Sequence, residues 1–97
     1  MEITNGKAKP TVANVSMTSA NTEYSYTLPE GTRSFWMKLR DPGYSAQVAM
    51  VEGDSNTTYF TIQNQKTHKE EEVKSSNTVL YFRSTQASMV MEIISFR

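Results

Sequence analysis

Apolar and polar residues alternate along most of this chain with a period of two. In residues 24–28 (YSYTL) the large apolar side chains fall on every second position, and the same alternation returns in residues 32–40 (TRSFWMKLR). Successive side chains of a β-strand point to opposite faces, so both segments are predicted to be strands. Residues 29–31 (PEG) interrupt the pattern with the proline and glycine that a tight turn favours. Residues 24–40 therefore predict a β-hairpin with one face in water.

Similar segments recur along the rest of the chain, separated by turn residues roughly every ten positions. The further predicted strands are residues 10–18, 44–51, 57–63, 78–83 and 89–96. The first is expected at a sheet edge, because it starts at Pro10. Residues 78–83 and 89–96 are apolar on both faces, which predicts a central position for the former.

The charge run of residues 68–74 (HKEEEVK) is predicted to be an exposed edge segment or loop rather than a short helix, since it contains one apolar residue. Strands of this length and spacing are typical of a sandwich or a small barrel. We expect an all-β fold, a single antiparallel β-sandwich of about seven to eight short strands. The pattern leaves jelly-roll and immunoglobulin-like strand orders open.

The length of 97 residues predicts one domain. Residues 1–9 contain Ile3 and an Asn-Gly turn but no strand pattern, so they are expected to form an extended arm that either frays or orders on a neighbouring subunit. The sandwich domain is expected to span residues 10–97.

The composition of the chain argues against several classes of partner. Ten acidic residues balance ten basic ones, which argues against strong nucleic-acid binding, and no apolar run approaches the ~20 residues of a membrane-spanning helix. The chain has no cysteine, and its start lacks a signal-peptide pattern, so we expect synthesis in the cytoplasm.

Catalytic signatures are weak. His68 is the single histidine and sits in the charge run, where a Ser-His-Asp triad is not expected. Glu70 to Glu72 are consecutive and would point to opposite faces of a strand, and Glu52 and Asp54 lack the spacing of a calcium loop. We therefore expect no enzyme activity, no metal and no cofactor.

Trp36 is the main anomaly in the pattern. It falls on the side of its strand that carries Lys38 and Arg40, where an aromatic residue among cations is typical of a protein interface. A tolerated surface tryptophan, or a register shifted by one residue that buries it, are the alternatives. With the two-faced strand at residues 89–96 included, the candidate interface residues are Ile3, Trp36, Lys38, Arg40, Val90, Ile94 and Phe96.

Four segments carry a resemblance to a known group of proteins: NTEYSYTLPEGTRSFWMKLR (21–40), TYFTI (58–62), TVLYF (78–82) and VMEI (90–93). Together they resemble small β-rich structural proteins of tailed bacteriophage virions. The resemblance implies a virion location and a capsid decoration (cement) protein that binds and stabilises the assembled head, or alternatively a head-tail connector or tail component. Its implied partners are the major capsid protein or other virion proteins, and its implied state is a homo-oligomer, a trimer or a dimer.

A second class of function remains open. In a carbohydrate-binding β-sandwich, Trp36, Tyr44 and Tyr59 would stack on sugar rings. This hypothesis requires the three aromatic side chains to share one exposed, flat face.

Overall fold

The computed structural model describes residues 10–71 and 78–97. Within these ranges the chain forms eight strands and one short 3-10 helix. In chain order they are β1 (Thr11–Met17), β2 (Tyr24–Thr27), β3 (Ser34–Leu39), β4 (Ala46–Ala49), η1 (Asp54–Asn56), β5 (Phe60–Ile62), β6 (His68–Glu70), β7 (Val79–Arg83) and β8 (Met89–Phe96).

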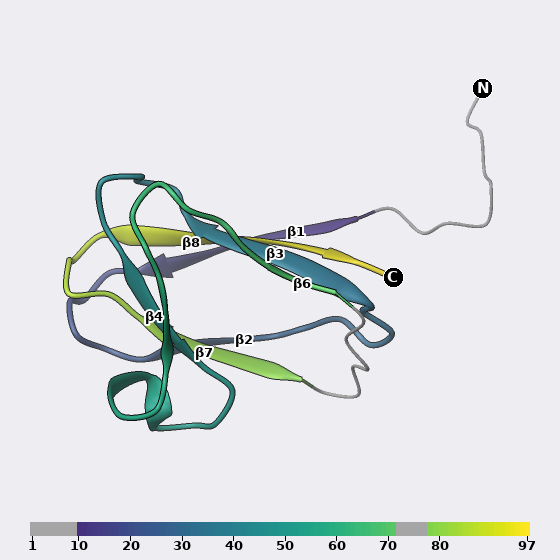
Figure 1. The fold of residues 1–97 in the computed structure, drawn as a ribbon, viewed down its shortest axis with the longest axis horizontal. Helices are drawn as coiled ribbons and strands as arrows, with labels where there is room; N and C mark the ends of the chain where they lie inside the picture. Colours follow the sequence, from purple (N-terminus) through teal and green to yellow (C-terminus); the bar gives the residue numbers. More distant parts are fainter. Residues whose placement is uncertain (1–9, 72–77) are drawn as a thin grey trace.

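The strands form two four-stranded sheets packed face to face (Figure 1). Sheet A has the order β1-β8-β3-β6, sheet B has the order β2-β7-β4-β5, and every neighbouring pair is antiparallel. Strand 1 pairs with 8, 2 with 7, 3 with 6 and 4 with 5, as in a long hairpin folded over on itself. This is the strand order of a jelly roll. The predicted all-β antiparallel sandwich is confirmed, and of the two open strand orders the jelly roll is the one observed.

The predicted hairpin of residues 24–40 is wrong, although its two strands and its turn are present. β2 pairs with β7 in sheet B, whereas β3 pairs with β8 and β6 in sheet A. The turn between them is a corner that crosses from one sheet to the other. The buried Thr32 donates hydrogen bonds from its backbone N–H (3.2 Å) and its hydroxyl (2.6 Å) to the Pro29 carbonyl, and Gly31 has a φ of 84°. A turn motif fixes where the chain changes direction but does not select the pairing partner.

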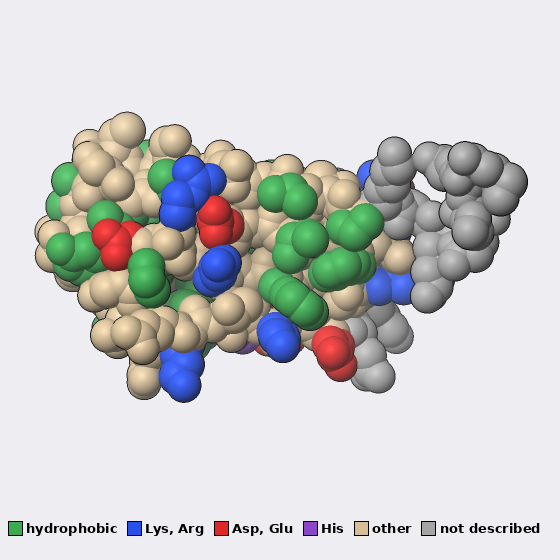
Figure 2. Space-filling model, turned by 90° about the horizontal axis from the view of Figure 1, so that it is seen from above, with side chains coloured by type: hydrophobic (Ala, Val, Ile, Leu, Met, Phe, Trp, Pro, Cys, Tyr) green, Lys and Arg blue, Asp and Glu red, His purple; other side chains and the backbone are tan. Residues whose placement is uncertain are grey.

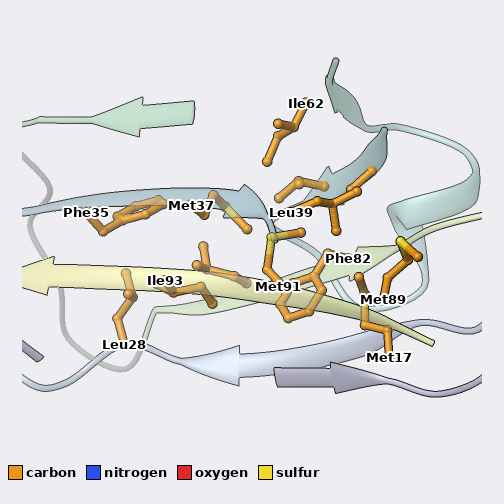
Figure 3. Close-up of a cluster of buried hydrophobic side chains, with 13 residues drawn as sticks. Met17, Leu28, Phe35, Met37, Leu39, Ile62, Phe82, Met89, Met91 and Ile93 are labelled. Atoms are coloured by element: carbon orange, nitrogen blue, oxygen red, sulfur yellow. The ribbon is translucent and has the colours of Figure 1, made fainter. Parts of the chain in front are cut away.

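The core fills the space between the two sheets, and the alternating residues of both contribute to it (Figure 3). From β3, for example, Phe35, Met37 and Leu39 are buried, as the alternation predicts. Four of the six methionines also lie in this cluster: Met17, Met37, Met89 and Met91. Unbranched methionine side chains fill irregular gaps, so here they serve packing between the sheets rather than an exposed contact surface.

The positions of several strands follow the sequence prediction. β1 lies at one edge of sheet A and β6, within the charge run, lies at the other, while β7 and β8 are each flanked by strands on both sides. The predicted arm at residues 1–9 lies outside the described residues, as do residues 72–74 of the charge run.

Glu23 fixes the loop that carries η1, a contact with no signal in the sequence. Its carboxylate accepts hydrogen bonds from the backbone N–H of Gly53 (2.9 Å) and of Ser55 (3.2 Å). Burial alone would raise the pKa of Glu23, but the hydrogen bonds from Ser55 and Gly53 and the charge of Arg83 outweigh it and lower that pKa. The carboxylate thus holds together two segments about thirty residues apart in the sequence.

Candidate protein-binding face

The outward-facing side chains of sheet A form one continuous surface across its strands β1, β8, β3 and β6, which we call the outer face of sheet A. Alternation along β3 and β8 sends the odd-numbered residues into the core and the even-numbered ones outward. The strand register then aligns residues that are distant in the sequence. Ile94 lies between Val12 of β1 and Trp36 of β3, and Glu92 lies between Asn14 and Lys38 in the next row.

Part of the outer face is apolar. Val12 is 65% exposed and Trp36 is 41% exposed, and beside them lie the partly exposed Ile94 and Phe96. We call these four residues the apolar patch. Figure 2, which looks onto this side of the molecule, shows hydrophobic side chains gathered next to charged ones. Exposed apolar groups of this kind on an otherwise polar surface often mark a binding site.

The ring of Trp36 is held from two sides. Its centroid lies 5.8 Å from that of the Phe96 ring, at an interplanar angle of 58°. The Lys69 ammonium of β6 lies 4.5 Å from the centroid of the Trp36 ring. A tilted aromatic pair and a cation over an indole face are each mildly stabilising. They hold Trp36 in an exposed position without burying it, which lowers the entropy that it would lose on meeting a partner.

A charged group adjoins the apolar patch. Arg40 Nε donates to Glu92 Oε2 at 2.8 Å, and Lys38 Nζ lies 3.6 Å from Glu92 Oε1. The hydrogen bond from Arg40 and the positive charges of Arg40 and Lys38 lower the pKa of Glu92 below its usual value. Since two cations share one carboxylate, this part of the face keeps a net positive charge at neutral pH.

We predict that Glu92→Gln destabilises the fold by less than about 1 kcal/mol at pH 7, the usual range for exposed ion pairs. The lowered pKa means that the folded state favours the ionised carboxylate. The contribution is therefore complete above the unfolded-state pKa of about 4.3 and is lost as the pH falls through the lower folded-state pKa. Urea unfolding of both proteins at pH 7 and near pH 2 should show a difference that disappears at the acidic pH. An equal difference at both values would assign the effect to packing instead.

A shallow hollow of about 390 Å³ lies on the same face, lined by residues that include Val12, Asn14, Trp36 and Ile94. Its lining is largely apolar, and its one carboxylate, Glu92, is engaged by Arg40 and Lys38. Among the described residues that line it, none is a nucleophile paired with a base.

The outer face brings together six of the seven candidate residues named from the sequence: Trp36, Lys38, Arg40, Val90, Ile94 and Phe96. The register that would bury Trp36 is excluded, because its neighbours Phe35 and Met37 are the buried ones. Ile3 lies outside the described residues. Sequence reasoning missed Val12, Lys69 and Glu92, whose membership depends on which strands pair and not on any local pattern.

Of the remaining candidate side chains, His68 and Tyr59 lie apart from this face, whereas Tyr44 lines a hollow that Lys38 and Arg40 also line. His68 Nε2 lies 3.0 Å from Glu70 Oε1, and the centroid of the His68 ring lies 4.4 Å from that of the Phe60 ring. In residues 10–71 and 78–97, no three His, Cys, Asp or Glu side chains gather as a metal site would require. Trp36 and Tyr44 line two adjoining hollows that share Lys38 and Thr67, whereas the hollow of Tyr59 has no lining residue in common with either, so the three aromatic side chains do not line one common surface.

The described part of the chain has no helix long and apolar enough to cross a membrane.

Comparison with solved structures finds a protein whose fold is similar to that of this chain. The chain resembles a de novo designed double-stranded beta-helix whose solution NMR structure is known, with a TM-score of 0.54 and 17% identity over 93% of this chain and 100% of that one. At this level of identity the likeness concerns the fold alone, and it agrees with the jelly-roll strand order. No protein-family model matches the chain, and no curated protein matches it.

Proposed function

We propose that this protein is a non-enzymatic structural subunit that binds another protein through the outer face of sheet A. In its specific form, the proposal is that the chain is a capsid decoration protein of a tailed bacteriophage and binds the assembled head. The observation that carries the binding role is the apolar patch, with Val12 65% and Trp36 41% exposed on a sheet face that also carries Asn14, Lys38 and Glu92.

The composition of this face supports a protein as the partner. Tryptophan and arginine dominate the energetics of protein interfaces, and a patch with an aromatic centre and a charged margin has the usual anatomy of one. Here Trp36 and Phe96 form the centre, and Lys38, Arg40 and Glu92 form the margin. The ion pairs would fix the orientation of the partner more than its affinity.

The virion role rests on the sequence resemblance of residues 21–40, 58–62, 78–82 and 90–93 to phage structural proteins. The jelly roll is compatible with it, since viral capsid domains use this fold, but lectins and cupins use it too. A head-tail connector or a tail component would need the same binding face. Sugar binding is less favoured, because Tyr59 lines a hollow that shares no residue with those of Trp36 and Tyr44.

The test is the uptake of the purified protein by phage capsids assembled without it. After incubation over a range of concentrations, capsid-bound protein is separated by sedimentation and quantified, with an unrelated β-sandwich protein of similar mass as the control. The decoration role predicts saturable uptake at a fixed number of copies per capsid. Linear uptake equal to that of the control would contradict it, and saturable uptake by tails alone would move the role to the tail.

A further inference from the structure

The four edge strands in the described part of the molecule differ in how they guard against pairing with another chain. Sheet A ends in β1 and β6, and sheet B ends in β2 and β5. β5 and β6 have three residues each and β2 has four, and β6 carries His68, Lys69 and Glu70. Short length and charge are the usual means of blocking an edge.

β1 has neither protection. It is seven residues long, and its sequence, TVANVSM, contains no charged residue and no proline. It pairs with β8 without a bulge from Thr11 opposite Ser95 to Met17 opposite Met89, and β8 is its one neighbour in the described sheet. A long, regular and uncharged edge of this kind is a template for adding another strand.

We propose that the occupant of this edge is a second copy of the same chain, paired antiparallel through β1 about a two-fold axis at Asn14. This axis brings all seven residues of β1 into register with the partner copy and joins the two copies of sheet A into one eight-stranded sheet. Thr11 then lies opposite the partner's Met17, Val12 opposite the partner's Ser16, and Asn14 opposite its own counterpart.

The side chains of β1 fit this pairing on both faces. On the inner face, the half-buried Ala13 lies opposite the partner's Val15, so that each copy covers apolar surface left open at the sheet edge. On the outer face, the two Asn14 amides can hydrogen-bond to each other. No like charges meet along the strand, and the chain as a whole has no net charge to repel a second copy.

The symmetry also limits the assembly. Pairing through β1 uses the same edge on both copies and leaves the charged, three-residue β6 at each end of the joined sheet. Such a contact closes as a dimer and does not continue into a fibre. It places the two apolar patches on the same side of the joined sheet, because antiparallel partners project opposing residues to the same face. The inference goes beyond the proposed function, since it requires no capsid.

The register can be tested by cross-linking. Because the chain contains no cysteine, Asn14→Cys introduces a single thiol whose counterpart would lie within the distance that a disulfide spans. Oxidation should give a covalent dimer in high yield. Thr61→Cys, an exposed position on edge strand β5, is the matched control and should remain mostly monomeric. Equal cross-linking of the two variants would overturn the proposed register.

The stability of the proposed dimer can be tested by placing charged side chains at position 14, on the two-fold axis. Asn14 is exposed and faces Glu92 within its own copy, so Asn14→Lys should leave the fold intact. In the dimer, the two introduced lysine side chains would lie opposite each other across the axis, and their repulsion should weaken the dimer at least roughly fivefold. A mixture of Asn14→Lys and Asn14→Glu should restore dimers, because opposite charges then meet at the axis. Sedimentation equilibrium measures both, as a change between the 11.0 kDa monomer and twice that mass.

Two results would overturn the proposal. One is a monomer at every concentration up to about 1 mM, the weak end of the usual affinity scale. The other is a dimer that survives Asn14→Lys but is lost in Trp36→Ala, since this would place the contact on the apolar patch. Capsid uptake by a protein that remains monomeric would refute the dimer and leave the proposed function standing. A β1 dimer that ignores capsids would do the opposite.

Discussion

Replacing Phe82 with alanine is expected to lower the free energy of unfolding by about 3–5 kcal/mol, the usual cost of emptying a buried aromatic site. Phe82 is 0% exposed and lies on β7, between Tyr24 of β2 and Val48 of β4. Neighbouring strands on both sides and sheet A above leave little freedom to fill the cavity. Because domains of this size are stable by only about 5–15 kcal/mol, the variant should unfold at a much lower urea concentration. Circular dichroism during urea titration measures the shift.

Phe96→Ala is the matched control for this prediction. The same side chain is removed, but from the partly exposed outer face of sheet A. A loss of about 1 kcal/mol is expected, since a partly exposed ring forfeits only part of the transfer free energy of a buried one. If both variants lost equal stability, the placement of Phe82 in the core and of Phe96 outside it would be in error.

The sequence was a reliable guide wherever a local period determines the structure. The alternation in residues 32–40 predicted which side of β3 is buried and left Trp36 outward with Lys38 and Arg40, and the structure agrees on each. The structure also accounts for the second apolar face that the sequence shows in residues 89–96. It follows from β8 being covered by the core on one side and contributing Ile94 and Phe96 to the apolar patch on the other.

Strand pairing was beyond such reasoning. Residues 29–31 were a correct turn, but the two strands beside them belong to different sheets, since in this jelly roll most consecutive strands change sheet. The row of Val12, Ile94 and Trp36 depends on contacts between the two ends of the chain. Its apolar character emerges only when those ends pair, and the hydrogen bonds from Gly53 and Ser55 to Glu23 are equally non-local.

Strand pairing also determines the composition of the charged group, which therefore could not be predicted from the sequence. Lys38 and Arg40 were identified as neighbours of Trp36 on one strand, but their common partner is Glu92 on the adjacent strand. Without that carboxylate the two cations would have no partner among the described residues of this face. With it, both cations are held in place, while this part of the face keeps a net positive charge.

Removing the Trp36 side chain is expected to weaken binding to the partner at least roughly 30-fold, the effect of truncating an interface residue worth about 2 kcal/mol. Trp36 is suited to this role because it is large, central to the apolar patch and already held by Phe96 and Lys69. The measurement is the concentration dependence of capsid uptake by Trp36→Ala. Circular dichroism should show that the variant keeps the fold.

Tyr59→Ala provides the control for Trp36→Ala because the two residues are equally exposed, at 42% and 41%, while Tyr59 lines a different hollow beside η1. If the outer face of sheet A is the binding surface, Tyr59→Ala should bind like the unmodified protein and Trp36→Ala should not. Loss of binding in Tyr59→Ala alone would move the interface to the end of the molecule that carries η1. Equal losses in both would indicate that exposed aromatic residues bind the capsid without a defined site.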